Sequence, residues 1–160
     1  PYVITRNVSV SVANGITPTL NIEPGVEVRF NPGTVLKIGY WNYTNHKGAL
    51  SAIGTAEQPI TFTSNAATPA PGDLRGIFFD NGIDDTTTRL EHCKIEYGGN
   101  TNNENLYLRN ASPTIKDCEI SNSSSYGVLF DNYSAKITSN IFFNNLNASI
   151  SLPPNSVPSK

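Results

Sequence analysis

The chain has 160 residues, 15% of them charged, and a formal net charge of -2 at pH 7. This length suits a single domain with a hydrophobic core, and the charge excludes the basic surface of a nucleic-acid-binding protein. No apolar run approaches the ~20 residues that span a bilayer, and two cysteines make no disulfide framework. Asn, Ser and Thr number 20, 15 and 15. We associate this lysine-poor composition with secreted or cell-surface proteins and expect that location.

Short strands are predicted along the whole chain. Apolar and polar residues alternate at 8–12 and 26–30, and shorter runs follow at 36–38, 60–63 and 77–79. Such alternation is typical of strands that bury one face. Pro and Gly interrupt every segment before a helical period can establish itself. We therefore expect an all-β protein.

The second half of the chain repeats one unit. Residues 90–97 align with 115–122, 25 positions later, and those align with 137–144, a further 22 positions on. A flanking run moves with them, since 106–108 matches 128–130 at the same spacing as the second pair. A period of roughly 22–25 residues with three short strands predicts the coils of a β-solenoid. The chain has room for about five or six such coils.

Stacking would align equivalent residues of successive coils into ladders ~4.8 Å apart. Two apolar ladders are expected in the core. The residue before the Cys or Asn position of each unit should take the left-handed backbone of a sharp bend, which His and Asp tolerate better than Ser. The first ladder is Leu90, Ile115 and Ile137, the second is Ile95, Ile120 and Phe142, and the bend residues are His92, Asp117 and Ser139.

Five segments carry a family resemblance, namely 22–26, 48–55, 59–64, 93–99 and 112–115. They are similar to the opening coils and rungs of right-handed parallel β-helix repeat proteins of bacterial and archaeal surfaces. The resemblance extends over roughly 20–150 and implies a right-handed parallel β-helix. That family includes adhesins, surface-layer components, scaffolds and polysaccharide-active enzymes.

Three segments are expected along the chain. Residues 1–25 should form an N-terminal cap or atypical first coil, residues 26–152 the β-helix, and residues 153–160 a Pro/Ser-rich tail or linker. Residues 149–152 begin a rung that the following prolines interrupt, and no amphipathic helix can cover that edge. Because an open parallel edge accepts another strand, we expect further coils or a docked partner there, including end-to-end self-association.

The two cysteines occupy the same position in successive units. Cys93 and Cys118 should stack, with Asn140 as the next member of the ladder. Their Cα atoms would lie within disulfide range, but parallel side chains would strain the bond. Two buried thiols are the preferred interpretation, and a disulfide is the alternative.

Three aspartates form a candidate metal site. Asp80, Asp84 and Asp85 lie around one loop, and Ca²⁺ prefers several carboxylate and carbonyl oxygens. The spacing matches no defined calcium loop, so a solvated turn is the favoured alternative. No other cofactor is expected.

An aromatic loop is the candidate ligand-binding site. Tyr40, Trp41, Tyr43 and His46 lie close together, and Trp41 is the single tryptophan of the chain. Aromatic faces beside polar donors suit a sugar or a protein partner. A flap packed over the first coils is the favoured alternative.

No catalytic signature is present. Polysaccharide lyases and hydrolases need carboxylates, or a basic residue with bound calcium, that converge in a groove. Charged side chains that point outward from the strands could supply these groups. A surface of alternating charges explains the same side chains equally well. We expect a non-catalytic extracellular module for surface structure, adhesion or self-assembly, with polysaccharides or surface proteins as partners. The alternative is a polysaccharide-active enzyme or carbohydrate-binding fragment that uses the outward charges Glu91, Lys94, Glu96, Lys116 and Glu119.

Overall fold

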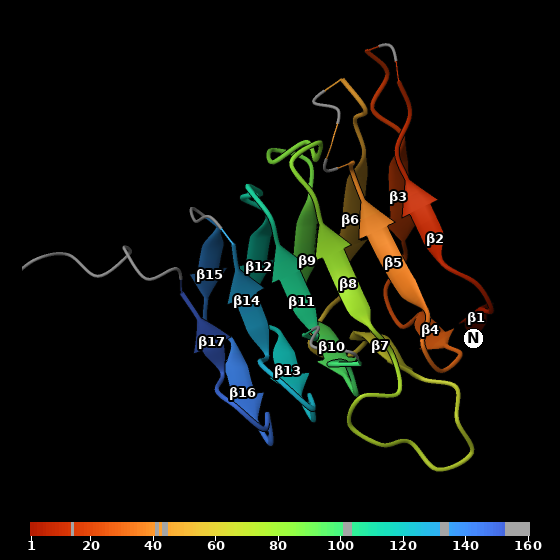
Figure 1. Ribbon diagram of the computed structural model, residues 1–160, viewed down its shortest axis with the longest axis vertical. Helices are drawn as coiled ribbons and strands as arrows, with labels where there is room; N and C mark the ends of the chain where they lie inside the picture. Colours follow the sequence, from red (N-terminus) through yellow and green to blue (C-terminus); the bar gives the residue numbers. More distant parts are fainter. Residues whose placement is uncertain (14, 41, 43–44, 101–103, 132–134, 153–160) are drawn as a thin grey trace, which may run out of the picture.

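The computed structural model describes the chain except residues 14, 41, 43–44, 101–103, 132–134 and 153–160. The described residues form 17 strands and no helix, and they contain no helical segment able to cross a membrane. The strands make three sheets that run side by side along a rod (Figure 1). The predicted tail at 153–160 lies outside the described residues.

Every third strand belongs to the same sheet. Sheet 1 contains β1 (Tyr2–Ile4), β4 (Glu27–Phe30), β7 (Ile60–Ser64), β10 (Cys93–Glu96), β13 (Glu119–Ser121) and β16 (Ile141–Phe143). Sheet 2 contains β2 (Val8–Val10), β5 (Val35–Ile38), β8 (Gly76–Phe79), β11 (Leu106–Leu108), β14 (Val128–Phe130) and β17 (Ile150–Ser151). Sheet 3 contains β3 (Thr19–Ile22), β6 (Ala49–Ile53), β9 (Arg89–Glu91), β12 (Thr114–Lys116) and β15 (Lys136–Thr138).

All pairings between these strands are parallel. One strand from each sheet makes one coil, so the chain forms five full coils, from β1–β3 to β13–β15, and begins a sixth with β16 and β17. The predicted parallel β-helix of five to six coils is confirmed. Residues 1–25 contain the three strands of the first coil.

The coils differ in length. Leu106 pairs with Val128, and Val128 pairs with Ile150, so the last coils keep the short period predicted from the sequence. Leu36, by contrast, pairs with Ile77, which lies much further along the chain. The longer coils carry extra loops between their strands, and the strands keep their parallel register across these loops.

Both predicted apolar ladders lie in the core. Leu90 stacks on Ile115 and Ile115 on Ile137, while Ile95, Ile120 and Phe142 stack in the same way on sheet 1. The four members on β9, β10, β12 and β13 are fully buried, and Ile137 and Phe142 are partly exposed. Full burial of such a side chain contributes about 1.5–3 kcal/mol.

The sharp bends are also confirmed. His92, Asp117 and Ser139 have φ values of 48°, 52° and 57°, and each turns the chain from sheet 3 into sheet 1. A second left-handed column follows the sheet 1 strands at Tyr97, Asn122 and Asn144, which the sequence did not predict. Asparagine is common in this region of backbone space, whereas Tyr97 gives no such signal.

Asparagine side chains replace backbone partners inside the bends. Asn105 is buried; its Oδ1 accepts a hydrogen bond from the Gly98 amide at 2.7 Å, and its Nδ2 donates to the Ser121 carbonyl at 2.7 Å. Asn145 joins the Ser123 amide to the Ile120 carbonyl in the same manner. These contacts give part of the asparagine-rich composition a structural role, because buried backbone groups need partners.

Candidate functional site

The outer face of sheet 2 carries a column of large side chains. The register places Lys37 beside Phe78, and Phe78 beside Tyr107. The two aromatic rings meet edge to face, with centroids 5.4 Å apart. Phe78 is only 6% exposed although it points away from the core, because other side chains cover it.

Two cations cover Phe78. Lys37 Nζ lies 5.9 Å and Arg75 Cζ 5.7 Å from the centroid of the ring, distances at which a cation is attracted to an aromatic face. Within the described part of the chain, neither cation has a carboxylate within 4.0 Å. Neither residue therefore forms an ion pair at that distance.

A third cation lies one coil further along. Arg109 Cζ is 5.2 Å from the centroid of the Tyr107 ring. Its Nε lies 3.7 Å from Asp80 Oδ1 and 3.8 Å from Asp131 Oδ2. Burial raises the pKa of Asp80, although Arg109 and Lys37 act in the opposite direction. Arg109 thus lies within ion-pair distance of two carboxylates, whereas Lys37 acts on Asp80 from further away.

A polar hollow adjoins this column. It has a volume of about 260 Å³ and is lined by Lys37, Asp80 and Tyr40, together with Asn7 and Ser9. It offers hydroxyl, amide, ammonium and carboxylate groups within one space. Such a mixture suits a hydroxyl-rich ligand.

The structure brings together residues that the sequence had assigned to separate sites. Tyr40 follows β5 and lines the same hollow as Asp80. The rings of Tyr40 and His46 lie 5.3 Å apart, so these two members of the predicted aromatic loop are neighbours. Trp41 and Tyr43 lie outside the described residues.

The three aspartates of the predicted metal site each contact a different residue. Asp84 Oδ1 accepts hydrogen bonds from the hydroxyl and amide of Thr86, and the hydroxyl in particular lowers the pKa of Asp84. Asp85 Oδ1 accepts a bond from the Ser112 amide at 2.6 Å, while Asp80 faces Arg109. The described residues contain no cluster of three or more His, Cys, Asp or Glu side chains arranged for a metal. The calcium site stays a prediction.

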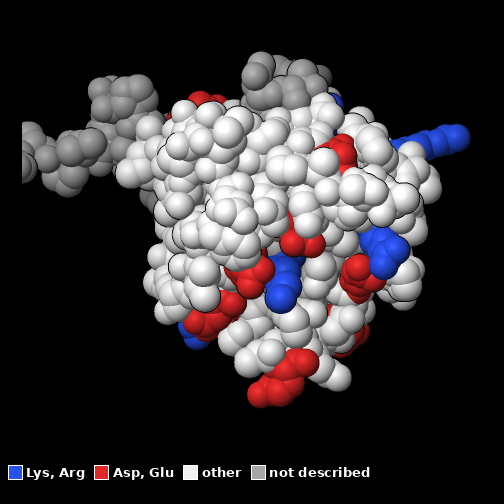
Figure 2. All heavy atoms as spheres, turned by 90° about the horizontal axis from the view of Figure 1, so that it is seen from below, with Lys and Arg blue, Asp and Glu red and all other residues white. Residues whose placement is uncertain are grey.

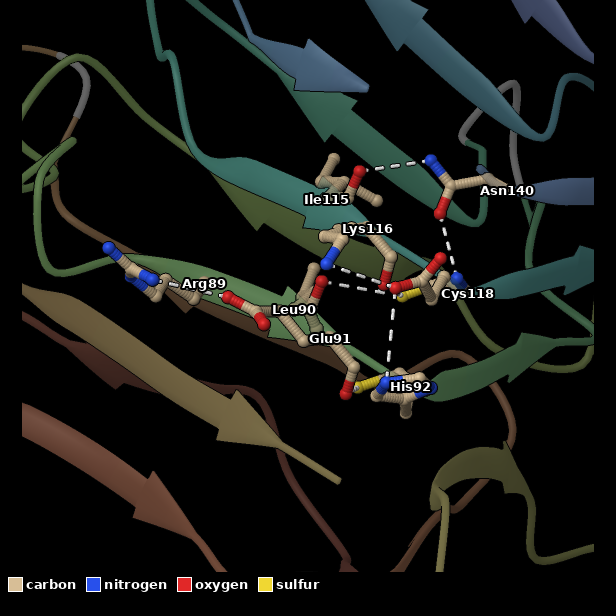
Figure 3. Close-up of polar contacts among 10 residues, drawn as sticks. Arg89, Leu90, Glu91, His92, Ile115, Lys116, Cys118 and Asn140 are labelled. Atoms are coloured by element: carbon tan, nitrogen blue, oxygen red, sulfur yellow. Dashed lines mark hydrogen bonds and ion pairs between the residues drawn. The ribbon is translucent and has the colours of Figure 1, made fainter. Parts of the chain in front are cut away.

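The two cysteines lie at the corner between sheets 3 and 1, since Cys93 begins β10 and Cys118 precedes β13. Figure 3 shows Cys118 at this corner. Cys93 and Cys118 are free thiols with 1% and 2% exposure. Asn140 Oδ1 accepts a hydrogen bond from the Cys118 amide at 2.8 Å, and its Nδ2 donates to the Ile115 carbonyl at 2.9 Å. The Cys118 thiol and burial raise the pKa of Cys93, which keeps its sulfur protonated at neutral pH.

A second hollow, of about 300 Å³, opens beside these thiols. His92 and Asp117 line it from the bends, with His92 Nε2 3.9 Å from Asp117 Oδ2. Lys116 Nζ lies 3.3 Å from the same carboxylate oxygen. Figure 3 shows His92 and Lys116 on either side of this corner. Because His92 and Asp117 occupy the same position in successive repeat units, the sequence alignment could have predicted their contact.

The outward charges considered for catalysis lie on two different sheets. Glu91 and Lys116 belong to sheet 3, whereas Lys94, Glu96 and Glu119 belong to sheet 1. The Thr63 hydroxyl donates to Glu96 at 2.7 Å. Figure 2 shows acidic and basic groups interspersed on the face seen from below. These charges therefore form a mixed surface over two sheets.

Sequence reasoning missed the cation and aromatic column of sheet 2. Lys37 and Phe78 are register partners, as are Phe78 and Tyr107. In both pairs the separation along the chain exceeds the period of the later repeats. A search for cations next to aromatic residues near each strand could have found Arg75 and Arg109. It could not have shown which aromatic ring each cation contacts, because that depends on the register of the strands.

The match to a family model agrees with this architecture. The model for the right-handed β-helix region matches residues 24–159. The chain therefore belongs to the right-handed β-helix family. Neither a curated protein nor a solved structure matched it.

Proposed function

We propose that the chain is a non-catalytic module that binds an acidic polysaccharide on the outer face of sheet 2. One observation carries this proposal: Lys37 and Arg75, from neighbouring coils, both lie over the Phe78 ring, and Arg109 lies over the Tyr107 ring of the next coil. Coils stack ~4.8 Å apart, so the two rings follow one another along the rod, with Arg75 placed before its strand and Arg109 after its strand. A linear polymer with carboxylates along its length would pass over these three coils.

The cations are also held in place before binding. Phe78 supports Lys37 and Arg75, and Tyr107 supports Arg109. Side chains fixed on a rigid sheet lose less conformational entropy when a ligand binds. The hollow beside Lys37 would receive sugar hydroxyls next to Tyr40 and Asn7.

A polysaccharide fits this surface better than a nucleic acid does. The chain has a net charge of -2, whereas nucleic-acid binding needs a broad basic surface. A secreted or cell-surface location, with a role in surface structure or adhesion, is part of the proposal. In this proposal the module binds the polysaccharide and does not cleave it.

Affinity electrophoresis in gels that contain polygalacturonate tests the proposal, with dextran as the neutral polymer. The double variant Lys37→Ala/Arg75→Ala should bind polygalacturonate about tenfold more weakly, equivalent to ~1.4 kcal/mol. The matched control Arg89→Ala/Lys116→Ala removes the same charge from sheet 3 and should bind like the parent chain.

Equal weakening in both double variants would contradict the proposal, because it would show that net charge alone attracts the polymer. Retardation by dextran as strong as that by polygalacturonate would also contradict it. New reducing ends after incubation with the polymer would exclude a purely binding role and favour the enzyme alternative.

A further inference from the structure

Two thiols on neighbouring coils occupy equivalent positions. Lys94 pairs with Glu119 in the parallel register, so Cys93 and Cys118, each one residue earlier, lie one above the other. The bend residues before them, His92 and Asp117, have nearly the same φ values of 48° and 52°. Both cysteines therefore leave the bend in the same direction.

The two side chains also make equivalent hydrogen bonds. Cys93 Sγ donates to the Ala52 carbonyl at 3.4 Å, and Cys118 Sγ donates to the Leu90 carbonyl at 3.4 Å. Ala52 and Leu90 are themselves register partners. Stacking by one coil places the backbones of the two cysteines ~4.8 Å apart, and the Cys118 thiol is close enough to Cys93 to raise its pKa.

This separation suits a bridging cation. Metal–thiolate bonds are about 2.3 Å long, so a linear sulfur–metal–sulfur unit spans about 4.6 Å, whereas a disulfide brings its Cβ atoms to ~3.5–4.5 Å. We propose that Cys93 and Cys118 form a two-coordinate site for a soft monovalent cation of the Cu(I) class. Thiolate ligands select such ions.

The ladder offers two sulfurs and no third ligand. Asn140, the next member, already uses both ends of its amide on the Cys118 amide and the Ile115 carbonyl. Zn²⁺ requires four ligands in a structural site, and the described residues hold no cluster of three or more His, Cys, Asp or Glu suited to a metal. The site therefore discriminates against Zn²⁺ by its number of ligands.

In this proposal the cation enters from the hollow at the corner. Both cysteines line the hollow of about 300 Å³, together with His92, Asp117 and Lys94. Binding breaks two S–H bonds, forms two metal–sulfur bonds and releases two protons. The site changes from neutral to a charge of -1, beside a hollow that is lined by Lys94 and by the carboxylates of Asp117 and Glu119.

Titration of the reduced full chain with Ag(I), in chloride-free buffer without oxygen, tests this site. Native mass spectrometry should find one Ag(I) per folded chain, with two protons released and a higher Tm. X-ray absorption should find two sulfur neighbours around the metal. Cys93→Ser and Cys118→Ser should each weaken binding by at least about a hundredfold, because each removes half of the bridge.

His92→Asn is the matched control, because it keeps both thiols and a residue that tolerates the bend. It should bind one Ag(I) like the parent chain. Retention of full affinity in either serine variant, two Ag(I) per chain, or binding accompanied by loss of the β-sheet circular dichroism would overturn the proposal. If a serine variant does not fold, nitrogen or oxygen neighbours in the absorption spectrum of the parent chain would overturn it equally.

Discussion

The coils in the middle of the rod and the coil at its C-terminal end share a repeat but differ in burial. Ile115 is fully buried, whereas its partner Ile137 is partly exposed in the same ladder. The outward residues differ too: β16 exposes Ile141 at 64% and Phe143 at 41%. A coil gains its core from neighbours on both sides, so equivalent residues contribute different amounts of stability.

The largest effect is expected when isoleucine is replaced by alanine at equivalent positions of two adjacent coils. Ile115→Ala should reduce the free energy of unfolding by about 2–5 kcal/mol, because it leaves a cavity in a closed core. Ile137→Ala should cost less than half as much, since its site is already partly solvated. Urea denaturation, with hydrogen exchange to separate the coils, measures both. Equal losses would show that the last coil is packed as tightly as the middle ones.

A second comparison concerns the asparagine braces. Asn105→Ala should reduce the free energy of unfolding by about 1–3 kcal/mol, because the buried Gly98 amide and Ser121 carbonyl lose their partner. Asn140→Ala should cost less, because Asn140 is half-buried and water can replace it. Thermal unfolding of both variants checks the order, and a larger loss at Asn140 would contradict it.

A third test uses pH. Burial raises the pKa of Glu104 from 4.5 to about 7, so the folded chain binds more protons than the unfolded chain between these values. Stability from this group is present below pH 4.5 and is lost as the pH rises to 7. Glu104→Gln should therefore leave the Tm unchanged at pH 4 and raise it by several degrees at pH 8. A gain of the same size at both pH values would exclude this cause.

The smallest expected effect is at the last bend. Ser139 has a φ of 57°, a conformation that asparagine adopts more readily than serine. Ser139→Asn should stabilise the chain by about 0.5 kcal/mol. Asp117→Asn should change the stability little, because aspartate already tolerates the bend and its partly exposed contacts with Lys116 and His92 contribute little. Matched thermal scans measure both, and a loss in Ser139→Asn would show that its hydroxyl has an unrecognised role.

The parts of the fold predicted from sequence are those with a constant period. Ile120 and Phe142 belong to neighbouring units of equal spacing, and simple alignment found their ladder. The early coils have loops of varying length, which hide the pairing of Lys37 with Phe78. Tyr40 and Asp80 were identified as candidates, but in separate sites, because only the folded chain places them around one hollow.

The parallel stacking also determines how the rod responds to force. Every strand pairs only with strands one coil away, so a pull along the axis acts along the hydrogen bonds and opens one coil at a time. Each opened coil releases a length of chain set by its residue count, roughly 75 Å for the stretch from Val128 to Ile150. The longer coils near the N-terminus release more, because the loops between their strands add to the length of chain in each coil.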